Sequence, residues 1–153
     1  MYGVSPAWFL SNFGEDFTCA QAAESLKALS RLGYEAWQPE IFLPERLKEW
    51  ERGDSRVLRS KCDDLDLRPS QFVAHFLLHS FESADALLSN RGLAECEGLL
   101  AVLVDWPDVP VVTIPLPAFK SNGYFSSSEY VHCFEALVEK LRLMVALIEK
   151  SGR

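Results

Sequence analysis

Two histidines and one glutamate lie at or just after short apolar runs that could be strands of a parallel sheet, which are positions where side chains can bind substrate or catalyse a reaction. His75 lies near the end of a short apolar run at 71–76, His79 follows four residues later, and Glu40 comes just after another short run. A histidine at a strand end could hydrogen-bond a sugar hydroxyl or bind zinc, and Glu40 could bind substrate or transfer a proton. The alternative is structural: hydrogen-bonded histidines at a strand end and a solvated loop glutamate.

A metal site carried by this chain alone is not expected. Zinc needs three or four converging protein ligands, and the one further histidine, His132, lies in the last predicted helix. The four cysteines lie far apart without a Cys-x-x-Cys pair, so we interpret them as single buried thiols. The spacing assigns no residue a catalytic role, and we expect the chain alone to bind no cofactor.

Aromatic residues gather after the first short apolar run, in a segment that we predict to be a loop. Trp8, Phe9 and Phe13 are the nearest of them. They could stack on a sugar face and exclude water, so Trp8 and Phe9 are candidate substrate-binding residues together with Glu40, His75 and His79. Equally, they could close one end of the core.

Short apolar runs alternate with helical periodicity along the whole chain. We predict four strands in these runs, at residues 2–4, 34–38, 71–76 and 111–114. The second strand should end at Pro39, because proline cannot donate a hydrogen bond to a neighbouring strand. Strands that alternate with helices predict a parallel sheet with right-handed connections.

The helices between these strands carry recognisable end signals. Thr18 and Gln21 have capping-box spacing before the first long helix, which Gly33 should end. Residues 45–68 should form one or two helices broken near Gly53-Asp54, and residues 83–104 a helix interrupted at 90–92. A second capping box, Ser126-x-x-Glu129, precedes a long final helix. Its apolar residues alternate steps of three and four: Val131, Phe134, Val138, Leu141, Val145 and Ile148.

This organisation predicts one α/β domain over residues 1–153. Four consecutive βα units with parallel strands would form half of a (β/α)8 barrel of the TIM type, since a full barrel takes roughly 250 residues. Parallel strands end at the same edge of a sheet, so Glu40, His75 and the Trp8–Phe9 segment should lie at one end. The last helix should cover the outer face of the sheet.

Composition restricts the classes of partner. The net charge of −7 argues against binding to nucleic acid, which requires a basic surface. No apolar run approaches the roughly 20 residues that span a bilayer, and no secretory signal opens the chain. We therefore expect a cytoplasmic protein that acts on neither nucleic acid nor membrane.

Three segments resemble the first strands of xylose-isomerase-like barrels. Residues 32–38 (Leu-Gly-Tyr-Glu-Ala-Trp-Gln) are similar to the second-strand signature of that family, residues 2–5 to its first strand and residues 72–75 to its third. One difference is Gln38, where many members have glutamate, although Glu40 lies two residues on. The resemblance implies the N-terminal half of a sugar or sugar-phosphate isomerase or epimerase. It implies metal-assisted proton transfer beside a carbonyl once the later strands, with their divalent-metal ligands, are present.

A half-barrel on its own should be inactive and should need a partner. Its open sheet edges and uncovered interior favour a homodimer or a complementing C-terminal half. The alternatives to an isomerase half are a non-catalytic assembly module or remnant and, less favoured by the acidic charge, a metal-dependent hydrolase of the apurinic-endonuclease branch.

Overall fold

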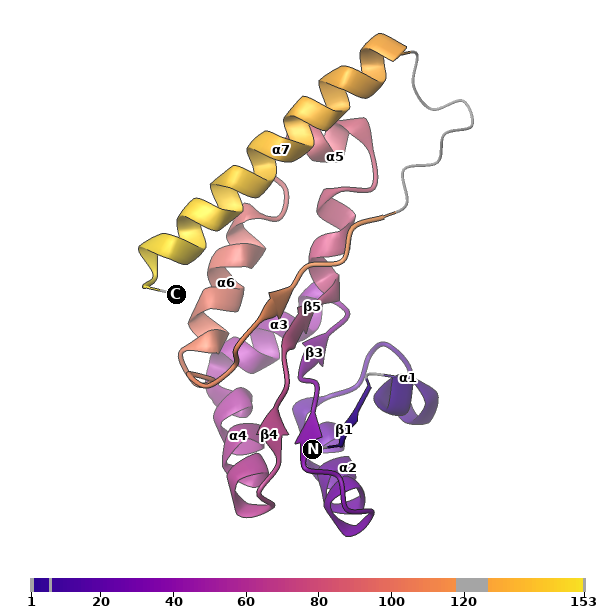
Figure 1. The fold of residues 1–153 in the computed structure, drawn as a ribbon, viewed down its shortest axis with the longest axis vertical. Coiled ribbons are helices and arrows are strands. Elements are labelled where there is room, and N and C mark those ends of the chain that lie inside the picture. The colour runs from indigo at the N-terminus through magenta and orange to yellow at the C-terminus, as the bar shows by residue number, and fades with distance from the viewer. Residues whose placement is uncertain (1, 6, 118–126, 153) are drawn as a thin grey trace.

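Four extended segments lie side by side in chain order, all parallel. The computed structural model describes residues 2–5, 7–117 and 127–152. β1 (Gly3–Val4) pairs with β2 (Ala36–Trp37), and β2 pairs with β4 (Arg68–Pro69). Further along the same segments, β3 (Glu40–Ile41) pairs with β5 (Phe72–Ala74), and β5 pairs with β6 (Val112–Thr113) (Figure 1). The α/β class with parallel strands is therefore confirmed.

A bulge opposite Pro39 divides these segments into two three-stranded sheets. Ala36 pairs with Arg68, but Glu40 pairs with Val73, so the later segment holds one residue more between the two pairings. The carbonyl of Pro39 still accepts a hydrogen bond from the Val73 amide, at 2.9 Å. The second strand ends before Pro39, as predicted, because proline has no N–H to donate; beyond the bulge, extended structure resumes at Glu40 as a separate strand.

The aromatic segment after β1 is a helix and not the predicted loop. α1 (Ala7–Phe13) precedes α2 (Cys19–Arg31), and Phe9 is fully buried against Phe17 with ring centroids 5.3 Å apart. Ser5 and Pro6, residue types favoured at a helix start, precede this helix in the sequence, and burial of Phe9 stabilises it. The capping box of α2 forms as predicted, with the Gln21 amide donating to the Thr18 hydroxyl and the Gln21 side chain accepting from the Thr18 amide.

Both predicted helix breaks are present, each at a glycine with positive φ. α3 (Pro44–Glu49) and the π-helical turn η1 (Trp50–Asp54) are followed by α4 (Ser55–Asp64), with Gly53 at φ 109°. After β5 come the 3-10 helix η2 (His75–Ser80), α5 (Ala84–Leu88) and α6 (Leu93–Leu103), with Gly92 at φ 89°. The third strand is shorter than predicted, because η2 begins at His75.

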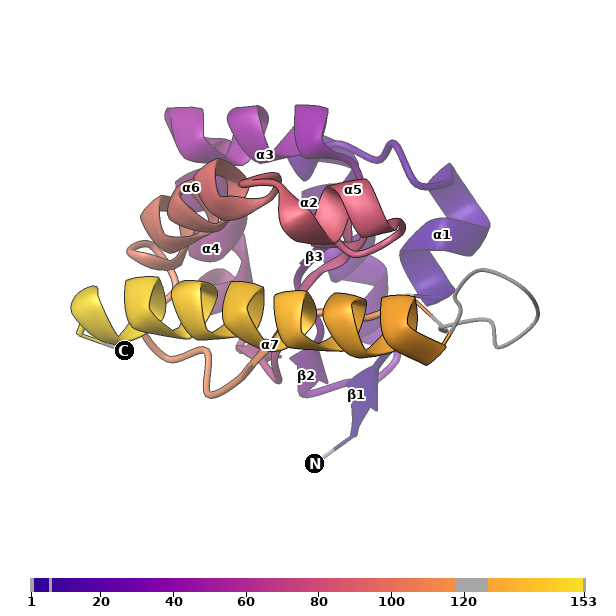
Figure 2. The ribbon, with the colours of Figure 1, turned by 90° about the horizontal axis from the view of Figure 1, so that it is seen from above.

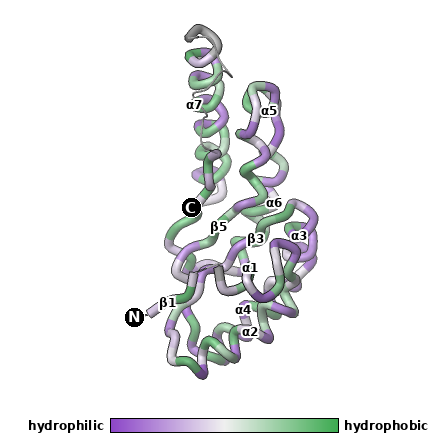
Figure 3. The backbone as a smooth tube through the Cα atoms, turned by 90° about the vertical axis from the view of Figure 1, so that its right-hand side faces the viewer, coloured by the Kyte–Doolittle hydropathy of each residue, from purple (hydrophilic) through white to green (hydrophobic). Residues whose placement is uncertain are grey.

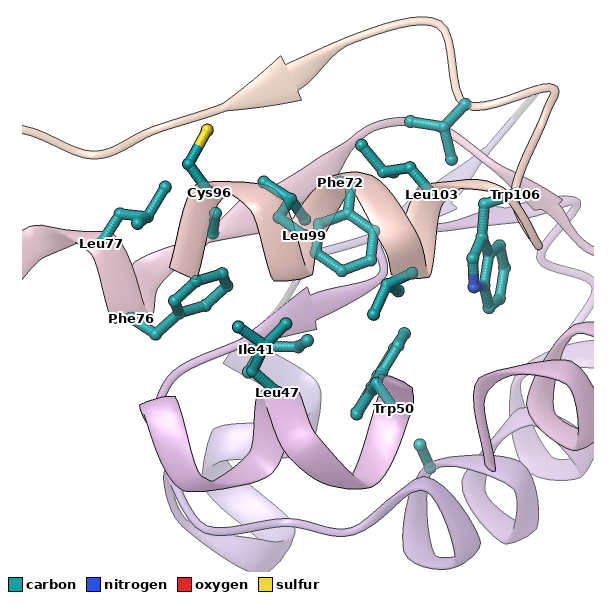
Figure 4. Close-up of a cluster of buried hydrophobic side chains, with 14 of the residues drawn as sticks. Ile41, Leu47, Trp50, Phe72, Phe76, Leu77, Cys96, Leu99, Leu103 and Trp106 are labelled. Carbon is teal, nitrogen blue, oxygen red and sulfur yellow. The ribbon is translucent and has the colours of Figure 1, made fainter. Parts of the chain in front are cut away.

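The core lies between one face of the sheet and the helices. Trp50 meets Phe72 edge to face at 5.6 Å, and Trp106 lies 6.0 Å from Trp37 and 6.1 Å from Trp50. Figure 4 shows Trp50, Phe72 and Trp106 together with Ile41 and with the aliphatic side chains Leu47 of α3 and Leu99 and Leu103 of α6. Contacts between large buried rings make this face the main apolar core of the fold.

The final helix, α7 (Ser127–Lys150), packs on α5 and α6 (Figure 2). Its buried side chains are Cys133, Leu137, Lys140 and Met144. The apolar stripe that the sequence analysis identified lies beside these buried residues. Three of its side chains are largely exposed: Val131 and Phe134 at 54% each and Val145 at 50%. The expectation that this stripe covers the outer face of the sheet is therefore wrong. The predicted capping box begins at Ser126, outside the described residues.

α7 also extends beyond the sheet. Figure 3 shows α7 and α5 reaching past β3 and β5, with hydrophobic and hydrophilic residues alternating along α7. None of the helices in the described ranges combines the length and apolar character that a bilayer crossing needs.

Candidate functional site

The structure brings together two of the residues that the sequence singled out. Glu40 begins β3, and His75 follows the last residue of the neighbouring β5. The His75 Nε2 atom lies 3.2 Å from the Glu40 Oε2 atom. Glu40 is next to the last residue of the extended segment 36–41, so the two side chains lie at the same end of the sheet, as parallel strands predict.

Glu40 is a buried carboxyl with few polar neighbours. Its exposed fraction is 1%, and neither carboxylate oxygen has a well-aligned hydrogen bond to another described residue. Burial raises the pKa of Glu40 above its ordinary value, and the neighbouring His75 opposes part of that rise. The contact to His75 is therefore the main polar interaction available to this carboxyl among the described residues.

His75 lies between that buried carboxyl and the surface. Its side chain is 28% exposed, whereas its Nε2 atom is buried against Glu40. The ring stacks on Phe42, with centroids 4.1 Å apart and planes 9° from parallel. Stacking sets the plane of the imidazole, and no described residue forms a hydrogen bond with its Nδ1 atom.

A ladder of polar side chains crosses the same face of the sheet. The Gln71 amide donates to the Gln38 side-chain oxygen, and the Thr113 hydroxyl donates to the Gln71 oxygen at 2.8 Å. Val73 is paired with Glu40 and alternates with Gln71, so Glu40 lies on this face too. The face opposite the main core is therefore polar, which differs from the apolar interior expected of an uncovered half-barrel.

His79 has different partners from His75. Its Nδ1 atom contacts the Phe76 carbonyl oxygen, and its Nε2 atom lies 3.6 Å from Glu95 of α6. The side chains of His79 and Glu95 are 29% and 30% exposed. These contacts connect η2 with α6, and they place His79 at the surface without joining it to the Glu40–His75 contact.

The two aromatic candidates lie on α1. Phe9 is fully buried and lies 5.5 Å from Trp37, which places it in the core. Trp8 is partly buried, and its indole Nε1 atom has no hydrogen-bond partner among the described residues. Aromatic contacts lead from Phe9 through Phe17 and Phe42 to His75, so α1 supports the site from one side.

Sequence reasoning missed Phe42, Gln71 and Thr113 as neighbours of the candidate residues. A polar residue two positions before Glu40, at Gln38, was the available signal, since side chains two apart share a face of a strand. The cross-strand register that joins Gln38 to Gln71 depends on the bulge, and no local pattern indicated it.

The described residues do not form a site for the divalent metal that the resemblance implies for a complete barrel. Among them, no group of three or more histidine, cysteine, aspartate or glutamate side chains could hold a metal ion. The buried Glu40 carboxyl beside the partly exposed His75 imidazole is suited to proton transfer rather than to metal binding. The carboxylate can orient the ring and stabilise an imidazolium, and the ring can accept and return a proton.

Comparison with protein-family models, with curated proteins and with solved structures found no match to this chain.

Proposed function

We propose that Glu40 and His75 form an acid–base pair that acts on a small hydroxylated substrate, a sugar or sugar phosphate. The observation that carries this proposal is the 3.2 Å contact between a fully buried carboxyl and a partly exposed imidazole. The two residues lie near the carboxyl ends of the adjacent parallel segments 36–41 and 68–74. In open α/β sheets and in barrels, ligands bind at this end of the strands.

His75 is the group that transfers the proton. Its Nε2 atom faces Glu40, so the neutral ring that carries its hydrogen on Nε2 has a lone pair on Nδ1. Nδ1 takes a proton from the carbon next to a substrate carbonyl, leaving the electron pair of that C–H bond in an enolate. Glu40 stabilises the imidazolium. The proton then returns to the former carbonyl carbon, while the hydroxyl proton of the neighbouring carbon moves to the enolate oxygen, so that carbonyl and hydroxyl exchange places and the isomerisation is complete.

The half-barrel is part of the same proposal. Support comes from four parallel extended segments in chain order, each followed by helix, which is the arrangement of consecutive βα units. The polar ladder of Gln38, Gln71 and Thr113 would then line the interior of the completed barrel. The missing groups, including any divalent-metal ligands, would come from a second half or a second copy.

Ligand binding tests the pair directly. Ligand-observed NMR would be recorded with the 153-residue chain and a panel of pentoses, hexoses and their phosphates. We expect millimolar binding of at least one ligand, weakened about tenfold by Glu40→Gln and by His75→Gln, the loss of about 1.4 kcal/mol typical of one polar contact.

The matched control is His132→Gln, which changes an exposed histidine of α7. This variant should bind as the wild type does. Binding that survives both site substitutions, or no binding across the panel, would contradict the proposal.

A further inference from the structure

α7 carries two apolar lines, of which the fold uses one. Cys133, Leu137 and Met144 are buried against α5 and α6. The second line, here called the outer stripe, follows steps of three and four along the whole helix. It consists of Val131, Phe134, Val138, Leu141, Val145 and Ile148.

The outer stripe lies at the surface. Val131 and Phe134 are each 54% exposed and Val145 is 50% exposed, while the other three are half-buried. Alternating steps of three and four repeat every seven residues, which is the spacing of a two-helix coiled-coil seam. A helix face of this kind on a surface is typical of an interaction site.

The spacing of the outer stripe reads the same in both directions. We propose that a second copy of this chain packs its α7 antiparallel against the outer stripe, forming a two-fold dimer. In that alignment Val131 lies opposite the partner's Ile148, Phe134 opposite the partner's Val145, and Val138 opposite the partner's Leu141. Each apolar residue meets an apolar residue, and the symmetric contact closes after two copies.

Charge at the edge of the outer stripe favours the antiparallel direction. Glu135 and Arg142 directly follow Phe134 and Leu141, on the side away from the body of the protein. In the antiparallel alignment Glu135 faces the partner's Arg142, and Arg142 faces the partner's Glu135, giving two ion pairs. A parallel alignment would set Arg142 toward the partner's Leu137, which is already buried in its own core.

A groove at the end of α7 extends the same surface. It lies between α6, the segment leading to β6 and the last turns of α7, and its lining includes Val104, Val111 and Ile148. Val104 is 72% exposed and Val111 is 53% exposed. The antiparallel alignment brings the partner's Tyr130 to this groove, and aromatic side chains in such pockets are frequent interface anchors. The inference does not depend on Glu40 or His75.

Molar mass in solution gives the first test. Light scattering of the full chain at about 50 µM should give twice the 17.3 kDa of one chain. Phe134→Glu with Val145→Glu should give a folded 17.3 kDa species, since a buried carboxylate without a partner opposes association. The control is Leu143→Glu, an exposed apolar residue on the opposite side of α7, which should remain dimeric.

Charge exchange tests the register. Glu135→Arg or Arg142→Glu alone sets like charges opposite each other in both pairs and should weaken the dimer at least tenfold. The double exchange restores opposite charges and should recover most of that loss. A double variant no better than the single variants would overturn the proposed alignment.

Disulfide trapping tests the direction. Phe134→Cys mixed with Val145→Cys should yield a crosslinked heterodimer, whereas Phe134→Cys alone should not, because an antiparallel pair separates its two copies by about 16 Å along the axis. Crosslinking of Phe134→Cys with itself would overturn the antiparallel arrangement. A monomer at 50 µM, or a dimer that survives Phe134→Glu with Val145→Glu, would overturn the inference altogether.

Discussion

The His75 Nε2 atom lies 3.2 Å from the Glu40 Oε2 atom, and the ring that carries it is stacked on Phe42. The two residues belong to different βα segments and meet only because β3 and β5 are adjacent and parallel. A buried carboxyl that has one imidazole as its main polar neighbour should make the free energy of unfolding depend on pH.

Glu40→Gln should change how stability depends on pH. Burial raises the pKa of Glu40 above 4.5, so the folded state holds this proton more tightly than the unfolded chain does. The contribution of Glu40 to the free energy of unfolding therefore falls as pH rises above about 4.5 and through the folded-state pKa. Relative to wild type, Glu40→Gln should gain stability between pH 4.5 and 7.5 in urea unfolding.

The control for that comparison is Glu82→Gln, which changes an exposed carboxyl. The difference between this control and wild type should stay constant over the same pH range. A constant difference for Glu40→Gln as well would show that Glu40 is not desolvated in solution.

Gly92→Ala should be strongly destabilising. Gly92 has φ 89°, and a Cβ atom there would lie 2.1 Å from the Ser80 hydroxyl oxygen and 2.7 Å from the Ser80 Cβ atom. Left-handed strain and the clash together should cost about 3 kcal/mol in urea unfolding. Gly53→Ala, with φ 109° and open space around its Cβ position, should show the strain alone, about 1 kcal/mol.

A double-mutant cycle separates the two costs. Adding Ser80→Gly to Gly92→Ala removes the clashing atoms but leaves the backbone strain, so the pair should couple favourably by about 1 kcal/mol or more. If the two changes in the free energy of unfolding were strictly additive, the Ser80 side chain would have to move aside in Gly92→Ala without destabilising the protein.

Lys140→Met should loosen the attachment of α7. The Lys140 ammonium is buried and donates to the carbonyl oxygens of Ser80 and Arg91, each at 3.1 Å, and of Ala86. Methionine keeps most of the apolar stem but leaves these acceptors without a donor, at a cost of about 2 to 4 kcal/mol. Hydrogen exchange of α7 amides should accelerate accordingly.

Lys150→Met provides the comparison, because Lys150 is an exposed lysine at the end of the same helix. It should change the free energy of unfolding by less than about 0.5 kcal/mol. Equal effects of the two substitutions would show that the buried ammonium does not hold α7 in place.

The cysteines should resist thiol reagents in the folded protein. All four are free and buried, and burial raises the pKa of Cys62 to about 12 and the pKa of Cys19 and Cys96 above the ordinary thiol value. The thiolate is the reactive form, so modification at pH 8 should proceed only as fast as the protein opens. A rapid phase of even one equivalent in a dithiobis(nitrobenzoate) assay would contradict this burial.

The 153-residue chain should not interconvert aldoses and ketoses, or their phosphates, when magnesium or manganese is added. The described residues include the Glu40–His75 contact but no group of three or more side chains that could hold a metal ion. Rates should equal those of buffer in a coupled assay. Turnover that is lost in His75→Gln would show that the pair completes a site without further groups.

Local sequence signals predicted most elements of this fold. The capping box at Thr18 and the breaks at Gly53 and Gly92 appear in the structure because they depend on residues within a few positions of one another. Helix α1 was missed although Ser5-Pro6 before it is a local helix-start signal. It depends on burying Phe9 against Phe17 and Trp37, and no pattern inside seven residues indicates those partners.

For the candidate site too, some features were predictable from local sequence and others depended on tertiary contacts. The sequence by itself predicted that Glu40 and His75 lie at the same end of the sheet, because strand–helix alternation implies parallel strands. Only the tertiary structure decided that Glu40 is buried, that Gln38 and Gln71 are bonded across a bulge, and that the outer stripe of α7 faces solvent. Burial and register depend on which surfaces meet across the chain, and the periodicity of one helix or strand does not specify its partner.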